Sequence, residues 1–204
     1  MVNKNRRRKM RKILILMLSV VMLGMIAGSS FAVSATVPQY PMYMTASGQG
    51  PDGMMLDILL NKSMGIPVKF DTVLKAENCA DMKTLIFVVG YSGKGMTAAS
   101  INDAAEEARV KALLDLAAKN NAYVIIVHMG GTSRRGGSSD KFTAIAAATA
   151  NKLIVIPDSN KDGYFNKMAE EKGIPLIVVD VPEGGSVRTL VAQALKAELP
   201  APVK

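Results

Sequence analysis

The sequence predicts a three-layer α/β/α sandwich built on a mainly parallel, flavodoxin-like or Rossmann-like sheet of five or six strands. Short continuous runs of branched apolar residues recur along the chain, as in strands that are buried on both faces of a parallel sheet. Segments with helical spacing of apolar residues separate these runs. Glycine and polar residues concentrate after the runs, at the edge where such sheets bind ligands.

Four continuously apolar runs predict four strands, and two further segments add the others. The four are expected at 85–89, 124–127, 153–156 and 176–179. Met42–Ala46 is a fifth candidate, and Val68–Thr72 is a short sixth that we place at an edge of the sheet. Because crossovers between parallel strands are right-handed, we expect the order 2-1-3-4-5, with the last strand added at the far edge.

Amphipathic segments connect these strands. Helices are expected at 51–64, 101–116, 139–149, 162–172 and 186–197. In the second of these, Glu106 and Arg109 fall largely on the polar side, which we expect to face solvent. No internal repeat or long linker divides residues 36–204, so we expect a single α/β domain there.

Residues 1–35 have the composition of a secretory signal peptide. Seven basic residues precede an apolar run from Ile13 to Ala27, and the small residues that follow allow cleavage after Ala32 or Ala35. The run is short for a membrane span, which needs about 20 residues; an uncleaved anchor is the alternative. We therefore expect an exported protein, periplasmic or extracellular, that has no membrane association after cleavage.

The basic balance of the chain belongs to this N-terminal segment. The whole chain carries 25 Lys and Arg against 17 Asp and Glu. Removing residues 1–35 removes seven bases and no acids, which leaves 18 bases against 17 acids. The predicted domain therefore offers no charge argument for a nucleic-acid partner. Its lone cysteine, Cys79, forms no intramolecular disulfide and is expected to be buried and inert.

The segment Gly48–Gly53 reads G-x-G-x-x-G after a predicted strand, with Asp71 eighteen residues beyond it. This is the outline of a dinucleotide-binding turn. Asp52, however, would place a negative charge beside the pyrophosphate, and an exported chain would meet little soluble nicotinamide cofactor. We interpret the segment as a tight strand-to-helix turn, and we predict no cofactor.

The loop Gly90–Gly95 approaches two motifs and fits neither. A nucleophile elbow requires glycine where Lys94 stands, and a P-loop requires glycine where Val88 stands. What remains is a glycine-rich loop in which Ser92 and Lys94 suit a carboxylate or a phosphate. A flexible loop with a solvated lysine is the alternative.

The loop after the fourth strand holds two adjacent arginines, Arg134 and Arg135, among four glycines. Guanidinium groups bind carboxylates in a bidentate manner, so this composition favours an anion site. His128, the only histidine, ends the strand. It is expected to be a hydrogen-bonded packing residue; the alternative is a general base beside a loop serine. One Cys and one His exclude a metal cluster of these residue types.

The segment Asp158–Gly163 matches D-x-N-x-D-G, the first half of a calcium loop. Ala169 stands where the glutamate ligand is required, and a strand precedes the motif. Calcium binding by Asp158, Asn160 and Asp162 therefore stands beside a simpler interpretation, in which Asn160 or Asp162 caps the next helix.

Together these loops predict a ligand site beyond the carboxyl ends of the strands. Its candidate residues are Ser47, Gly48, Gln49, Asp52, Ser92, Lys94, His128, Thr132, Arg134, Arg135 and Lys161. The leading hypothesis is an extracytoplasmic binding protein or sensor for a small anionic, carboxylate-type molecule. One alternative is a small hydrolase or transferase that uses His128 and a loop serine. Another is an envelope module that binds a partner protein.

Several segments also carry a resemblance to known sequences. They are 45–49 with 51–52, 83–86 running into Gly90, 128–131, 134–136, 139–141 and 160–163. On these segments the chain resembles a domain-of-unknown-function family of exported bacterial proteins. The resemblance implies an exported single α/β domain and brings no activity, catalytic residue or ligand with it.

Overall fold

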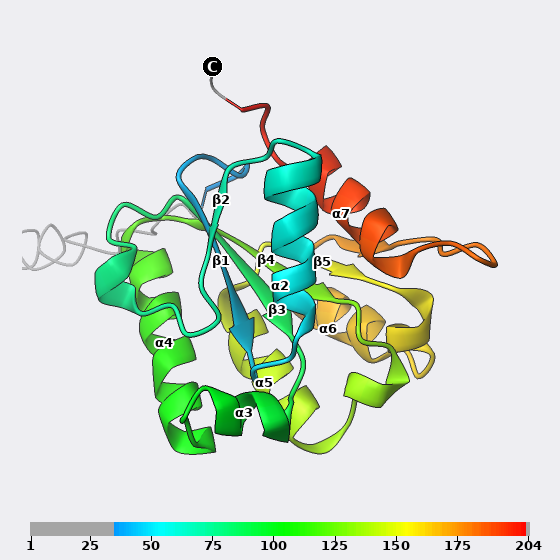
Figure 1. The fold of residues 1–204 in the computed structure, drawn as a ribbon, viewed down its shortest axis with the longest axis horizontal. Helices are drawn as coiled ribbons and strands as arrows, with labels where there is room; N and C mark the ends of the chain where they lie inside the picture. The colour runs from blue at the N-terminus through cyan, green and yellow to red at the C-terminus, as the bar shows by residue number, and fades with distance from the viewer. Residues whose placement is uncertain (1–34, 203–204) are drawn as a thin grey trace, which may run out of the picture. The chain divides into compact units, whose positions relative to one another are not determined.

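Six parallel strands form one sheet in the computed structural model, which describes residues 35–202 (Figure 1). The strands are β1 (Met42–Ser47), β2 (Val68–Phe70), β3 (Thr84–Val89), β4 (Tyr123–His128), β5 (Lys152–Val155) and β6 (Leu176–Val178). Their order is β2-β1-β3-β4-β5-β6, and every neighbouring pair is parallel. The predicted order is confirmed, including the short edge strand β2. The order reverses between β1 and β3, which is the switch point of the sheet.

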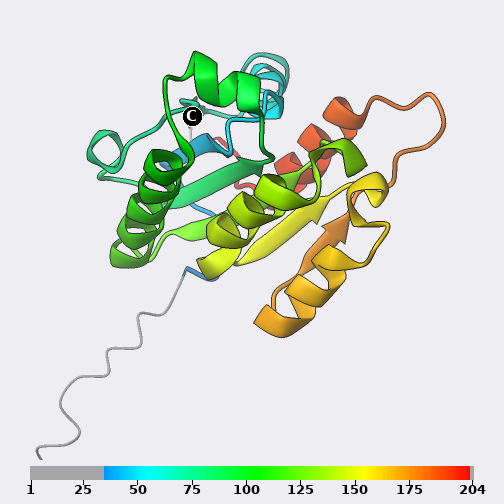
Figure 2. The same ribbon diagram turned by 90° about the horizontal axis from the view of Figure 1, so that it is seen from below.

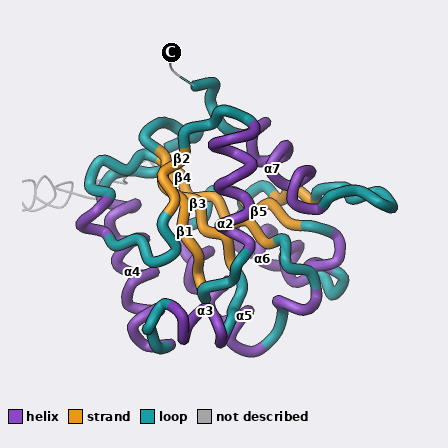
Figure 3. The backbone as a smooth tube through the Cα atoms, in the orientation of Figure 1, coloured by secondary structure: helices purple, strands orange, loops and turns teal. Residues whose placement is uncertain are grey.

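Helices alternate with these strands along the chain (Figure 3). They are α2 (Asp52–Asp57), α3 (Gly93–Ala98), α4 (Asp103–Lys119), α5 (Gly137–Ala146), α6 (Tyr164–Lys172) and α7 (Val187–Glu198). A π-helical segment, Ile58–Ser63, continues α2 without a break. Short 3₁₀ turns occur at Ala76–Asn78, Thr132–Arg134, Ala147–Thr149 and Pro157–Asn160.

The helices pack as two layers, one on each face of the sheet (Figures 1 and 2). On one face Leu60 and Val191, from the α2 extension and α7, pack with Ile86 of β3. On the other face Leu113 of α4 packs with Phe87, the next residue of β3. Because successive strand residues point to opposite faces, the continuous apolar runs fill both cores. The predicted three-layer sandwich is confirmed.

One helix lies where the sequence suggested a loop. Gly93–Ala98 forms α3, and the Ser92 hydroxyl caps it by accepting from the backbone N–H of Gly95 at 3.1 Å. Two of its six residues are glycines, which have low helix propensity, so composition carries no helical signal here. The cap and the packing of the loop against the end of β1 stabilise the turn instead.

The predicted signal peptide, 1–35, lies outside the described residues except for its last residue, and it stays a prediction. Among residues 35–202, none of the helices has both the length and the apolar character needed to cross a bilayer. Cys79 is fully buried in the core, as predicted. Burial raises the pKa of its thiol to about 11, so the thiolate is scarce at neutral pH.

Candidate functional site

The loops after β1 and β3 pack directly against each other at the switch point. The backbone N–H of Ser92 donates to the carbonyl oxygen of Gly48 at 2.8 Å. A Cβ atom at Gly50 would lie 2.7 Å from the carbonyl oxygen of Gly90, and one at Gly53 would meet an aromatic ring of β2 at 3.0 Å. The glycines of the G-x-G-x-x-G pattern therefore allow close chain-to-chain contact. The chain itself occupies the crevice in which a dinucleotide lies in related folds.

A buried carboxylate holds the loop after β1. Glu106 is fully buried, and its Oε1 accepts from the backbone N–H of Gly48 at 2.9 Å. Both of its carboxylate oxygens accept from Nε2 of Gln49 at 3.1 Å. Arg109, whose side chain is 7% exposed, pairs with Glu106 at 2.8 Å and donates to the carbonyl oxygen of Ala46 at 2.6 Å. The expectation that Glu106 and Arg109 face solvent was wrong, because the loop after β1 covers this part of α4.

Three further candidates from these loops serve local structure or face solvent. Ser47 is buried, and its hydroxyl donates to the carbonyl oxygen of Phe142 at 3.1 Å. Ser92 caps α3, and Lys94 is exposed on that helix. With Gly48 and Gln49 held by Glu106, the loops at the switch point are bonded mainly to the protein itself.

His128 ends β4 and is fully buried. Its Nε2 lies 2.9 Å from the carbonyl oxygen of Arg134, and its Nδ1 lies 2.7 Å from the hydroxyl of Ser159. A carbonyl oxygen only accepts, so Nε2 carries the proton and Nδ1 accepts from Ser159. Burial lowers the pKa of the imidazole and favours this neutral form. A general-base role would require a substrate to reach a side chain that has no exposed surface.

Acidification is therefore expected to destabilise the fold through His128. Below the pKa of an unfolded histidine, about 6.5, the unfolded chain binds a proton that the folded state does not. The free energy of unfolding then falls by up to about 1.4 kcal/mol per pH unit until the folded-state pKa is reached. Urea titrations at pH 7, 6 and 5 measure this slope. Because the chain has one histidine, His128→Gln should flatten it; equal slopes in both proteins would contradict the assignment.

Arg135 points into the junction between α5 and α6. Its side chain is 10% exposed, and it pairs with Asp140 at 2.7 Å and with Asp162 at 2.9 Å. It donates to the carbonyl oxygen of Ser159 at 2.5 Å, and its guanidinium lies 4.2 Å from the ring centroid of Tyr164. We call this group of contacts the arginine clamp. It joins the loop after β4 to the turn after β5.

The side chains of the calcium-like motif have separate partners. Asp158 accepts from the backbone N–H of Thr132 at 2.9 Å and pairs with Lys161. Asn160 and Asp162 each accept from a backbone N–H of the first turn of α6, although the N-cap position itself is Gly163, and Asp162 also joins the arginine clamp. Within the described part of the chain, no three His, Cys, Asp or Glu side chains are grouped to hold a metal. Calcium binding stays a prediction.

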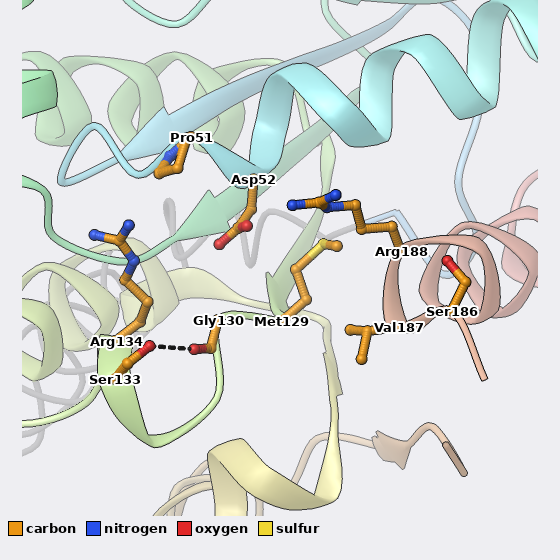
Figure 4. Close-up of a pocket in the computed structure, with 9 residues that line it drawn as sticks. All are labelled: Pro51, Asp52, Met129, Gly130, Ser133, Arg134, Ser186, Val187 and Arg188. Carbon is orange, nitrogen blue, oxygen red and sulfur yellow. Dashed lines mark hydrogen bonds between the residues drawn. The ribbon is translucent and has the colours of Figure 1, made fainter. Parts of the chain in front are cut away.

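A cleft of about 430 Å³ opens between the N-terminal ends of α2 and α7 and the loop after β4 (Figure 4). Its volume lies in the range of small-molecule sites. The lining residues are Pro51, Asp52, Met129, Gly130, Ser133, Arg134, Ser186, Val187 and Arg188. Of the residues that the sequence suggested, Asp52 and Arg134 line this cleft.

Three charged side chains dominate the cleft. Arg134 lies over Gly130, where a Cβ atom would approach its Cγ to 2.2 Å, and its Nη1 donates to the carbonyl oxygen of Tyr91 at 2.8 Å. Arg188 stands in the first turn of α7, is exposed, and makes no hydrogen bond or ion pair with other residues between 35 and 202. The carboxylate of Asp52, in the first turn of α2, likewise has no such partner within that range.

Sequence reasoning did not consider Arg188. The residue lies on an amphipathic C-terminal helix, far along the chain from the glycine-rich loops. The topology could have pointed to this residue. The loop that leads into α7 starts at the carboxyl end of β6, which lies at the same edge of the sheet as the other candidate loops. Ser186, which caps α7 by accepting from the N–H of Thr189 at 3.4 Å, marks where that helix begins.

The fold and the cleft define a doubly wound α/β domain with a charged cleft beyond the carboxyl edge of its sheet. The chain belongs to the family DUF6305, a domain of unknown function, whose model matches residues 39–190. The matched range includes every residue that lines the cleft. Searches among curated proteins and among solved structures find no match. The resemblance to a family of unknown function is confirmed, while export stays a prediction.

Proposed function

We propose that this protein binds a small anionic ligand of the carboxylate type in the cleft between α2, α7 and the loop after β4. The observation that supports this is that two arginines, Arg134 and Arg188, line one cleft of about 430 Å³ from opposite sides. Guanidinium groups bind carboxylates through paired, charge-assisted hydrogen bonds. The free N–H groups in the first turn of α7 add to the attraction for an anion.

With the predicted signal peptide, this site suits an extracytoplasmic binding protein or sensor. The described chain, residues 35–202, supplies a single sheet with its helices. A two-lobed receptor closes on its ligand by hinge motion, and one domain has no second lobe to do so. We therefore include an envelope protein that covers the loaded cleft as a partner in the proposal.

A thermal-unfolding screen of the purified protein tests whether a ligand binds. The compounds are small carboxylates, phosphates, nucleotides, and calcium with and without a chelator. A ligand at 100 times its dissociation constant stabilises the folded state by about 2.7 kcal/mol, which raises Tm by several degrees for a domain of this size. We expect carboxylates to give the shift. No shift from any compound would contradict the proposal and favour the partner-binding module.

Substitution of the two arginines tests where the ligand binds. Arg134→Ala and Arg188→Ala should each weaken binding by roughly 10- to 100-fold, because a hydrogen bond to a charged group contributes about 1.5–3 kcal/mol. Titration calorimetry measures the dissociation constants. Lys94→Ala and Lys161→Ala are matched controls, since each removes a positive charge that lies outside the cleft. Losses confined to the two lysine variants would move the site to the loops that the sequence favoured.

A further inference from the structure

The charge pattern of the cleft narrows the class of ligand. We propose that the cleft recognises a small dicarboxylate that also carries an ammonium or hydroxyl group between or beside its two acids. This inference rests on the proposed function and adds the chemistry of the ligand to it. It follows from the position of Asp52 relative to Arg134 and Arg188 in one cleft (Figure 4).

Asp52 projects into the cleft, and in the view of Figure 4 its carboxylate lies between the two arginine side chains. No ion pair within 4.0 Å joins it to either arginine in the described chain. Its Oδ2 lies above Gly130, 3.3 Å from the point that a Cβ atom there would occupy. An acidic residue in the first turn of a helix is favourable for the dipole wherever its side chain points. The helix dipole therefore accounts for an acidic residue in this turn, but it does not account for the position of the Asp52 carboxylate above Gly130.

A ligand that has only anionic groups would place one of them near Asp52 and be repelled. A ligand that also has a hydrogen-bond donor avoids this cost, because an ionised carboxylate accepts strongly from an ammonium or a hydroxyl group. The cleft offers two positive groups and one negative group. An amino-dicarboxylate offers the inverse set, two negative groups and one positive, and a hydroxy-dicarboxylate offers two negative groups and a neutral donor. Complementarity of this kind determines specificity more than raw affinity.

Three four-carbon acids that differ at one position test the inference: succinate, malate and aspartate. Titration calorimetry of the purified protein should show malate or aspartate binding at least about tenfold more tightly than succinate, the difference expected for one charge-assisted hydrogen bond. Asp52→Asn should bring the preferred acid and succinate to within about threefold of each other and should strengthen succinate binding. Glu183→Gln is the matched control, since it removes an exposed negative charge from the loop before α7 without altering the cleft lining.

The outcomes separate this inference from the proposed function. Equal affinity of the wild type for all three acids, or a preference that survives in Asp52→Asn, would overturn the inference and leave anion binding intact. Failure of all three acids to bind would also overturn it. If the wider screen of carboxylates and phosphates then gives no binding either, the proposed function falls with it. A change in Glu183→Gln as large as that in Asp52→Asn would show that net charge, and not position in the cleft, sets the preference.

Discussion

Replacing Arg109 with methionine is expected to lower the free energy of unfolding by about 3–5 kcal/mol, the usual cost of leaving one member of a buried ion pair alone. Glu106 would keep a charge in a position that is fully buried. Arg109 also donates to the carbonyl oxygens of Ala46 at 2.6 Å and Leu74 at 3.0 Å, and these would lose a charged donor. The large expected effect follows from burial, because an exposed pair of the same spacing on a helix contributes well under 1 kcal/mol.

Urea denaturation followed by circular dichroism measures the change. Lys111→Met is a suitable control, since Lys111 pairs with Glu107 on the same helix at 2.7 Å, with its side chain 59% exposed. That variant should lose less than about 1 kcal/mol. The double variant Glu106→Leu with Arg109→Met removes both charges and should be more stable than Arg109→Met alone, although Gly48 and Gln49 lose their acceptor. A cost for Arg109→Met as small as that of the control would contradict the buried network.

Arg135→Ala is expected to destabilise the protein by about 2–4 kcal/mol, whereas Arg134→Ala, one residue earlier, should cost less than about 1 kcal/mol. The pair with Asp162 contributes little to this difference, because the Asp162 side chain is 63% exposed and solvent screens its charge. The difference comes from the pair with Asp140, whose side chain is 28% exposed, from the bond to the Ser159 carbonyl oxygen and from contact with the ring of Tyr164.

Denaturation of the two single variants separates these roles. Arg135→Lys should recover only part of the loss, since a lysine cannot present a flat fork to two carboxylates, a carbonyl and a ring together. Arg134→Ala should unfold nearly as the wild type does while binding its ligand less tightly. If Arg135→Ala were as stable as the wild type and lost the ligand instead, the arginine clamp would be part of the binding site.

The fold could be predicted from the sequence because buried parallel strands leave an unusually clear pattern. Leu85–Val89 and the runs that form β4 and β5 are apolar at every position, as expected for strands buried on both faces of a parallel sheet. Topology then follows from right-handed crossovers. The short helix α3 had no such signal, because glycines give its sequence the appearance of a loop.

The candidate site could be predicted only in part, because composition does not say what a polar side chain contacts. The sequence predicted the edge of the sheet at which the cleft lies, because glycine-rich loops follow the strands at that edge. Arg134 and Arg135 are indistinguishable by type and position in the sequence, and tertiary contacts alone assign them to different surroundings. Glu106 and Arg109, three residues apart on a helix, have the appearance of an exposed pair. The loop that buries them is distant in the chain, since its Gln49 and Glu106 are 57 residues apart.

The cleft is built by the first and the last helices of the described chain, α2 and α7. Residues 51–52 and 186–188 line the same cleft although strands β2 to β6 lie between them along the chain. A partly synthesised chain that still lacks α7 therefore lacks one side of the cleft. The proposed ligand would bind and stabilise only a molecule in which α7 is in place. A chain cut before residue 186 would retain all six strands and lose one of the two cations of the cleft.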